Sequence, residues 1–210
     1  MDEKATIYFD GACLPRNPGG IATYGYVIFW SDKKFEGSGV VAENSTNNVA
    51  EYSALIEAVR KALSLGIKKV MIRGDSQLVI RQLLGVYAVR SPRILPLYDE
   101  LSRLLDKFDD VELEWVPRKQ NAHADALSTK AYLDYMYEKQ VQRALEIKDE
   151  EIKQLDEIHF KVRSYDVNVE KPSCTCPAFA NLNKYYLLKR DNIIVPCKHI
   201  IAVMLLLKNR

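Results

Sequence analysis

The chain has 210 residues and a net charge of +2, and 48% of its residues are hydrophobic. A chain of this length and composition can bury a core, and it has room for one medium domain and one smaller domain. The N-terminus shows no leader-like segment, and no apolar run is long enough to span a bilayer. The sequence therefore argues against a membrane protein, and we expect a cytoplasmic protein with no membrane partner.

The charge is distributed unevenly. Residues 160–210 contain nine Lys and Arg against three Asp and Glu, a net charge of +6, whereas residues 1–159 carry a net charge of −4. A basic small module next to an acidic larger one suggests a polyanionic partner. A solvated basic surface is the more common meaning of such a count, so both interpretations stay open.

Hydrophobic periodicity predicts the order strand, strand, strand, helix, strand, helix, helix, strand, helix. Turn-forming segments rich in Gly, Pro and Asn separate several of these elements. The predicted strands are residues 6–13, 22–30, 34–41, 69–74 and 111–116. The predicted helices are residues 50–65, 76–84 and 95–108, and a further helix begins at residue 122.

The first strand carries an acidic side chain. Alternation places Asp10 on the face opposite Ile7 and Phe9, and Gly11 follows at once. A carboxylate delivered by a buried strand is costly without a partner. Three later acids stand near the ends or beginnings of predicted elements, and we expect all four to converge on divalent metal: Asp10, Glu51, Asp75 and Asp125.

Two of these acids also have simpler interpretations. Asn48 with Glu51 three residues later can form a capping pair at the start of a helix. Asp75 fits equally as a residue that starts the helix containing Ser76. Neither interpretation excludes a role in metal binding.

Four segments carry a resemblance to a known family. They are Asp10-Gly11-Ala12-Cys13, Thr46-Asn47-Asn48-Val49-Ala50-Glu51, Gly74-Asp75-Ser76-Gln77 and Asn121-Ala122-His123-Ala124-Asp125-Ala126. In order and spacing they resemble the signature segments of ribonuclease H of type 1, over about residues 1–135. The resemblance implies an α/β fold with a five-stranded mixed sheet flanked by helices, which agrees with the predicted element order. Fold alone does not imply an activity.

The resemblance also implies roles for the four acids. Asp10 would bridge two cations, Glu51 and Asp75 would share one of them, and Asp125 would hold the cation on the nucleophile side. Carboxylate oxygens suit Mg²⁺ or Mn²⁺. Two such ions about 4 Å apart would activate water and stabilise the leaving oxygen of a phosphodiester. The alternative is four unrelated cap and surface acids.

Substrate contacts follow from the same resemblance. Amides that match family positions near the minor groove of a hybrid can pair with 2′-hydroxyls, and Gly11 permits close backbone approach. These candidate residues are Gly11, Asn17, Asn47, Asn48 and Gln77. Phosphate contacts would come from Arg90, Arg93, Arg118 and Lys119, with solvated surface charge as the alternative.

Two features seen in some relatives are missing. No basic helix lies between Leu84 and Leu95, and no loop histidine stands well before the last acid. His123 comes only two residues before Asp125. It could assist proton transfer or product release, but a surface histidine is the simpler interpretation.

A second constellation lies near the C-terminus. Cys174 and Cys176 are separated by 20 residues from Cys197 and His199. Together they give three thiolates and one imidazole, the donor set of a structural zinc ion. The pattern resembles the SWIM zinc finger, with a strand predicted over residues 161–169 and an apolar helix over residues 200–207. A disulfide is the weaker alternative. Cys13 stands outside this set and is expected to be a small buried side chain.

The ligand of the finger stays open between nucleic acid and protein. Basic and aromatic residues in its spacer would suit a surface that tracks phosphates and stacks on bases, namely Lys184, Tyr185, Tyr186, Lys189 and Arg190. Packing of the tyrosines in a small core is the alternative. If the finger binds nucleic acid, it would replace the missing basic helix by tethering the first domain to its duplex.

Residues 136–159 are interpreted as a helical linker between the domain at residues 1–135 and the finger at residues 160–210. Apolar residues near a heptad spacing allow a dimeric coiled coil: Val141, Leu145, Ile152 and Leu155. A bridging helix packed on the second domain explains so short a pattern better. We therefore favour a monomer, although the sequence does not determine the oligomeric state.

These features together predict an endonuclease that hydrolyses the RNA strand of RNA/DNA hybrids with two Mg²⁺ or Mn²⁺ ions. It would carry one structural Zn²⁺ in an accessory finger that binds nucleic acid or a protein. One alternative is a DNA strand-transfer enzyme or nuclease of the same superfold, against which the pair Asn47 and Asn48 argues. The other is an adaptor that binds the hybrid without cleaving it.

Overall fold

The computed structural model describes residues 3–184 and 193–208. The chain forms two compact units, Met1–Tyr132 and Leu133–Arg210, called here the first and second units. Among the described residues, no helix combines the length and the apolar character that crossing a membrane requires.

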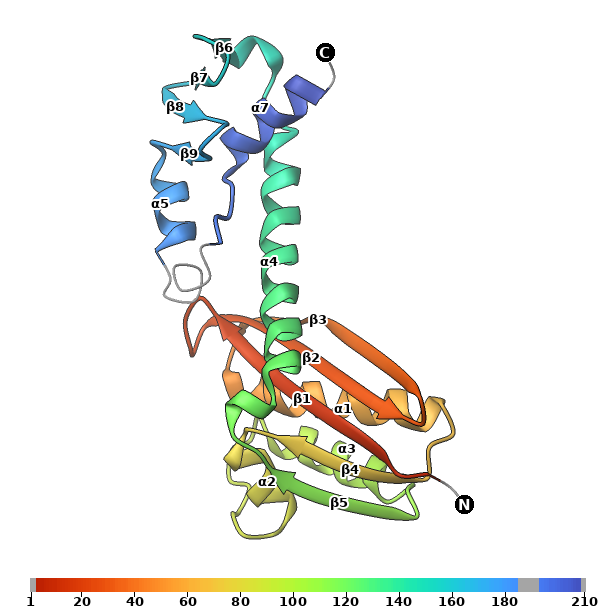
Figure 1. Cartoon of the computed structure of the whole chain (residues 1–210). Helices are drawn as coiled ribbons and strands as arrows, with labels where there is room; N and C mark the ends of the chain where they lie inside the picture. Colours follow the sequence, from red (N-terminus) through yellow and green to blue (C-terminus); the bar gives the residue numbers. More distant parts are fainter. Residues whose placement is uncertain (1–2, 185–192, 209–210) are drawn as a thin grey trace. The chain divides into compact units, whose positions relative to one another are not determined.

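The first unit is built on a five-stranded mixed sheet with the order β3-β2-β1-β4-β5 (Figure 1). Its strands are β1 (Ala5–Leu14), β2 (Gly20–Trp30), β3 (Lys33–Ser45), β4 (Lys69–Gly74) and β5 (Asp110–Trp115). The first three strands form an antiparallel meander, and β4 and β5 join parallel to β1. The predicted fold class is confirmed for this unit.

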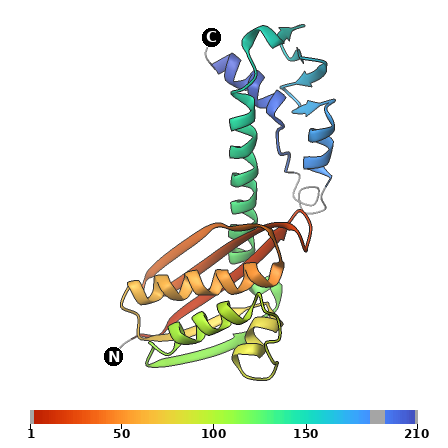
Figure 2. The same ribbon diagram turned by 180° about the vertical axis from the view of Figure 1, so that it is seen from behind.

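Helices cover both faces of the sheet. They are α1 (Asn47–Ser64), α2 (Gln77–Leu83), α3 (Leu95–Leu105) and α4 (Ala122–Ala144), with a short 3₁₀ turn at Arg118–Gln120 before α4. Figure 2 shows α1 and α3 side by side on one face. Ile7 and Phe9 point to this side and are fully buried, as their alternation predicts. The first turns of α4 pack against β2 at Gly25, where an added Cβ would lie 2.5 Å from the backbone of Ala124.

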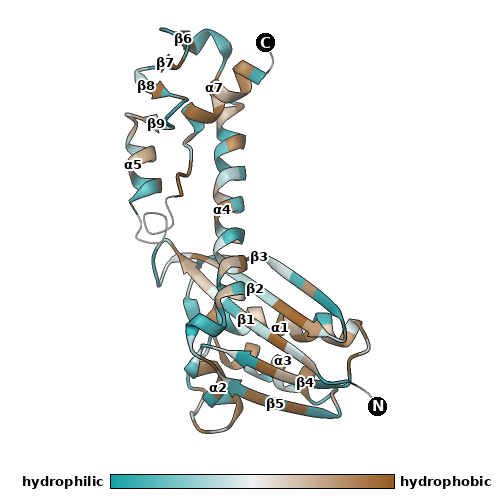
Figure 3. Ribbon diagram, viewed as in Figure 1, coloured by the Kyte–Doolittle hydropathy of each residue, from teal (hydrophilic) through white to brown (hydrophobic). Residues whose placement is uncertain are grey.

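The second unit has its own sheet and core. Its antiparallel sheet has the order β6-β7-β8-β9, formed by β6 (Ile152–Gln154), β7 (His159–Val162), β8 (Tyr165–Asn168) and β9 (Ser173–Cys174). A 3₁₀ turn (Asp149–Glu151) precedes the sheet, and α5 (Pro177–Asn183) and α7 (Lys198–Lys208) follow it. Phe160, Val162 and Ile200 are fully buried in its core. Figure 3 shows α7 hydrophobic over most of its length, in keeping with its role as the core helix of this unit.

Two predictions about this region are wrong. The helical linker predicted over residues 136–159 ends at Ala144, and Ile152 lies in β6, so the heptad pattern does not describe one continuous helix. Ile147 is buried in the core of the second unit and Ile152 packs against that core, because burial there removes both side chains from water. The strand predicted over residues 161–169 is in fact two strands that reverse at Arg163, whose φ is 54°.

Candidate active site and metal centre

Asp10 lies within β1 rather than at its end, because β1 continues to Leu14 in its pairing with β2. The parallel pairing of β1 with β4 stops at Phe9 and Gly74. Asp10 and Asp75 are the next residues on the two neighbouring strands. The register of the sheet therefore brings two acids together that are 65 residues apart in the chain.

Glu51 reaches the same region from α1. A Cβ at Gly11 would lie 2.1 Å from the backbone nitrogen of Glu51, so only glycine allows α1 to approach β1 this closely. Thr46 caps the helix by accepting a hydrogen bond from the Val49 N–H at 3.3 Å. The predicted capping pair of Asn48 with Glu51 is therefore wrong, because the helix begins earlier and a hydroxyl caps it.

Asp75 is held by a residue from the start of α4. Asn121 is 1% exposed, and its Nδ2 donates to Oδ1 of Asp75 at 2.6 Å and to the carbonyl of Phe9 at 2.8 Å. The cap of α2 is Ser76, which accepts a hydrogen bond from the Val79 N–H. The interpretation of Asp75 as a helix cap is thus also wrong, and its carboxylate is directed to the site instead.

Asp125 lies in the first turn of α4 and forms an ion pair with Arg118. Its side chain is 18% exposed, against 62% for Arg118. The resemblance predicts a phosphate contact for Arg118, with a solvated surface charge as the alternative, whereas its guanidinium pairs with the Asp125 carboxylate. No motif in the sequence indicates this pair.

Burial and mutual repulsion hold protons in the cluster. The pKa of Asp10 is raised to about 7, mainly by burial and also by the charges of Asp125 and Asp75, while a hydrogen bond from Ser128 acts to lower it. Burial and the charges of Asp10 and Asp75 also raise the pKa of Glu51 well above its usual value. Asp10 is thus coupled to Asp125 and Asp75, and Glu51 to Asp10 and Asp75, so the four acids lie in one region of the first unit. That they hold cations together stays a prediction.

The cluster fits hard divalent cations. Oε2 of Glu51 is buried and has no hydrogen-bond partner within the described part of the chain. A buried carboxylate oxygen without a donor is costly, and a cation would compensate it. The donor set is carboxylate oxygen alone, the type that Mg²⁺ and Mn²⁺ prefer.

Three of the candidate substrate residues, Asn17, Asn47 and Asn48, lie at the start of α1, whereas Gln77 begins α2. The Asn47 N–H donates to Oδ1 of Asn17 at 3.0 Å, and Oδ1 of Asn47 accepts from the Cys13 N–H at 3.2 Å. Asn48 and Gln77 are exposed, whereas Gly11 is buried beneath α1. A groove of about 280 Å³ lies beside them, lined by Asn17, Pro18, Thr46, Asn48, Ser91, Arg93 and Ile94.

His123 is exposed, and its Nε2 lies 2.9 Å from Oε1 of Glu36 on β3. The surface interpretation of this histidine agrees with that contact. Cys13 is buried as expected, and its thiol lies 3.4 Å from the carbonyl oxygen of Ser45. Arg90, Arg93 and Lys119 are exposed.

Two residues of the site were given no role by sequence reasoning. Asn121 and Ser128 hold Asp75 and Asp10, respectively. Asn121 lies four residues before Asp125 and Ser128 three residues after it, which is the spacing of neighbours on a helix surface. That spacing from Asp125 is the one feature of the sequence that indicates a place for both residues near the site.

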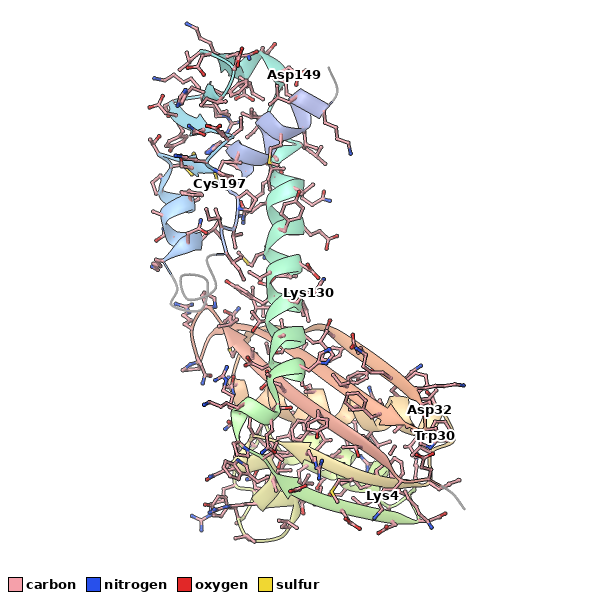
Figure 4. The ribbon with its side chains drawn as sticks, in the orientation of Figure 1. Lys4, Trp30, Asp32, Lys130, Asp149 and Cys197 are labelled. Carbon is pink, nitrogen blue, oxygen red and sulfur yellow. The ribbon has the colours of Figure 1, made fainter. Side chains whose placement is uncertain are left out.

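The second unit brings together the four predicted zinc ligands. The ligand atoms of Cys174, Cys176, Cys197 and His199 all lie within 4.8 Å of one another. Figure 4 marks Cys197 next to the start of α7, where His199 occupies the first turn. Three sulfurs and one imidazole nitrogen in a compact, largely buried group fit a closed tetrahedral zinc site.

Neighbouring groups orient the zinc ligands. The Phe179 N–H donates to the Cys176 sulfur at 3.3 Å, and the ring of Tyr165 stacks on His199 with centroids 4.8 Å apart. The pKa of Cys197 is lowered to about 4, first by a hydrogen bond from Cys174. Thiolate is the form that binds zinc.

Of the spacer residues proposed for the finger, Lys184 is exposed. The others lie outside the described residues: Tyr185, Tyr186, Lys189 and Arg190.

Comparison with known proteins places this geometry in a family. A family model described as reverse transcriptase-like matches residues 8–131, which is more than half of the chain. The chain belongs to the reverse transcriptase-like family. A second model, the SWIM zinc finger, matches residues 165–185 and 195–208, which contain the Cys and His cluster of the second unit.

Relatives of this reverse transcriptase-like protein include ribonucleases. Ribonuclease HI of Halobacterium salinarum is 40% identical over 133 residues, which cover 60% of this chain and 63% of the relative. The bifunctional protein Rv2228c of Mycobacterium tuberculosis is 37% identical over 134 residues, 61% of this chain and 35% of the relative. The chain thus spans about a third of the length of that curated relative.

Solved structures agree with the fold of the first unit. The crystal structure of LC11-RNase H1 in complex with RNA/DNA hybrid has a TM-score of 0.56 and 34% sequence identity. The match covers 61% of this chain and 96% of that chain. The predicted resemblance to ribonuclease H of type 1 with a SWIM finger is therefore confirmed.

Proposed function

We propose that the first unit is a metal-dependent endonuclease that hydrolyses the RNA strand of RNA/DNA hybrids. The proposal is supported by the electrostatic coupling among Asp10, Glu51, Asp75 and Asp125, and by a buried Glu51 oxygen that has no donor among the described residues. A relative named ribonuclease HI and a solved relative in complex with RNA/DNA hybrid support the substrate class.

The four acids would have different roles in cation binding. Asp10 would bridge two cations, with Glu51 and Asp75 on one and Asp125 on the other. Two bound divalent ions would supply an activated water and stabilise the leaving oxygen. Arg118 would leave Asp125 when the cluster binds its ions, since both compete for the same carboxylate.

The rim of the site would recognise the duplex. Asn17, Asn47, Asn48 and Gln77 carry amides that can donate to and accept from 2′-hydroxyls, which DNA lacks. Arg93 lines the groove next to Asn17 and Asn48, where its charge suits a backbone phosphate. Gly11 acts indirectly, because it lets α1 bring Glu51 to the site.

Cleavage assays test the proposal. A labelled RNA/DNA hybrid should be cut in Mg²⁺ or Mn²⁺, duplex DNA should remain intact, and Asp10→Asn should abolish cutting. Cutting of DNA alone would instead support a strand-transfer enzyme or DNA nuclease. Tight hybrid binding without cleavage would support an adaptor.

We further propose that the SWIM finger holds one structural zinc ion and binds nucleic acid. Its net charge of +6 over residues 160–210 supports this choice over a protein ligand. Lys171→Glu with Lys184→Glu, both at exposed positions, should weaken hybrid binding and reduce the salt slope by about two. Lys68→Glu, which precedes β4 at the end away from Asp75, is the matched control. An unchanged slope would point to a protein partner.

A further inference from the structure

Helix α4 approaches β2 closely at Ala124 and Ser128. A Cβ at Gly25 would lie 2.5 Å from the Ser128 backbone nitrogen, and Ser128 is fully buried. The Thr23 hydroxyl donates to the Ser128 carbonyl at 2.8 Å. This turn of α4 is therefore fixed to β2 by backbone contact and by a buried hydrogen bond.

The hydroxyl of Ser128 points at the acid cluster. It donates to Oδ2 of Asp10, a residue 118 positions earlier in the chain. The carbonyl of Asp125 lies 3.0 Å from the same hydroxyl, but Ser128 has a single proton and a carboxylate is the stronger acceptor. One turn of α4 thus carries Asp125 and also holds Asp10.

We infer that Ser128 is a positioning residue that fixes the carboxyl plane of Asp10 for cation binding. The inference rests on the proposed function of the site. Carboxylates that bind metals are themselves hydrogen-bonded, and loss of such an outer partner commonly weakens metal binding by about 10- to 100-fold. Ser128 is anchored on both sides, through Gly25 and Thr23, so its hydroxyl has little freedom to move away from Asp10.

The test measures Mn²⁺ binding to the zinc-loaded full chain by electron paramagnetic resonance, without nucleic acid. Ser128→Ala removes one buried oxygen and should raise the dissociation constant for Mn²⁺ by about 10- to 100-fold. Ser128→Cys, whose thiol is a weaker donor, should fall between Ser128→Ala and the parent chain. Thr129→Ala changes the next residue of the same helix and should match the parent. The part of the Mn²⁺ binding that is lost in Asp10→Asn is assigned to this site.

Kinetics separate positioning from a general structural effect. In Ser128→Ala the Mn²⁺ concentration for half-maximal cleavage should rise, while the KM for hybrid stays unchanged and the kcat recovers at saturating Mn²⁺. The melting temperature without Mn²⁺ should fall below that of Thr129→Ala, because a buried hydrogen bond is lost. Mn²⁺ binding is therefore measured well below both melting temperatures, where both variants are folded. Mn²⁺ affinity within about twofold of the parent, or no Asp10-dependent Mn²⁺ binding at all, would overturn the inference.

The two proposals can fail separately. Ser128-dependent Mn²⁺ binding without cleavage of hybrid would refute the nuclease and leave the role of Ser128 standing. Cleavage of hybrid, with a Mn²⁺ affinity that Ser128→Ala does not change, would refute the role of Ser128 and leave the nuclease standing.

Discussion

At the scale of residues, the molecule keeps acids where folding alone disfavours them. Asp10 and Glu51 are only 7% and 8% exposed, and burial raises both pKa values. Without cations these two groups keep their protons up to higher pH than ordinary carboxyls do. Cation binding to the acid cluster would therefore add to the stability of the first unit.

This predicts an unusual pH dependence for the first unit. The pKa of Asp10 is raised from 3.8 to about 7, so the folded state holds a proton that the unfolded chain releases between those values. Its contribution to stability is complete below pH 4 and is lost as the pH rises through 7. Glu51, whose pKa is also raised, adds to the loss in the same direction.

Urea unfolding measures this effect with Mg²⁺ and Mn²⁺ omitted and zinc retained. Both tryptophans of the chain, Trp30 and Trp115, lie in the first unit and report its unfolding. Between pH 5 and pH 8 the parent should lose roughly 3 kcal/mol more stability than Asp10→Asn. Equal slopes for the two proteins would contradict the prediction, and added Mn²⁺ should restore the parent at pH 8.

At the scale of elements, close backbone approaches place the site. Gly11 lets α1 approach β1, and Gly25 lets α4 approach β2, so that helices from two parts of the chain deliver acids to one edge of the sheet. Neither approach tolerates a Cβ without backbone movement. These glycines therefore serve packing, and through packing the site.

Gly11→Ala tests this point. The new Cβ would lie 2.1 Å from the Glu51 nitrogen and 2.2 Å from the Ala50 carbonyl carbon, so α1 must shift. We expect a loss of stability of about 3 kcal/mol or more, measured by urea unfolding, together with loss of Asp10-dependent Mn²⁺ binding. Gly11→Ala with parental stability would show that α1 lies farther from β1 than described.

In the SWIM finger, the side chain of Asn183 holds two segments of the chain together. Its Nδ2 donates to the carbonyls of Phe179 and Val195, and its Oδ1 accepts from the Val195 N–H at 2.8 Å. One side chain thus joins the two segments that carry the zinc ligands, at the start and end of the spacer between them.

Asn183→Ala should release zinc faster to a chelator and lower the stability of the finger by about 1 to 3 kcal/mol. Asn181→Ala is the control, since Asn181 is exposed in the same helix and accepts a long hydrogen bond from Lys184 at 3.4 Å. Identical zinc release from the two variants would contradict a structural role for Asn183.

The sequence predicted elements well where the periodic signal is long. The helix α1 buries one continuous face that includes Leu55, Ala58, Val59 and Ala62, and β1 buries Ile7 and Phe9 on one face. The second unit was predicted less well, because β6 has only three residues and β9 only two, too few for a period to show. Asn121 and Ser128 were missed because their partners are set by tertiary contact.

At the scale of the whole molecule, two separate cores carry two different kinds of site. The core of the first unit includes Ile7, Phe9 and Tyr52, and that of the second includes Phe160, Val162 and Ile200. The zinc ligands Cys176 and Cys197 belong to the second core. A small core of this kind depends strongly on its metal.

Removal of zinc should therefore unfold the second unit and leave the first unit folded. In differential scanning calorimetry, a strong chelator should abolish the transition of the second unit, since metal binding contributes to its folding. The transition of the first unit, followed by tryptophan fluorescence, should stay where it is. A joint loss of both transitions would show that the two units fold as one.

We propose that four acids from distant parts of the chain form one cation site at the edge of the sheet. Anomalous diffraction from a crystal soaked in Mn²⁺ measures this directly. We expect manganese peaks in contact with the carboxylates of Asp10, Glu51, Asp75 and Asp125, and no such peaks in Asp10→Asn. Well-ordered carboxylates with no manganese among them would contradict it.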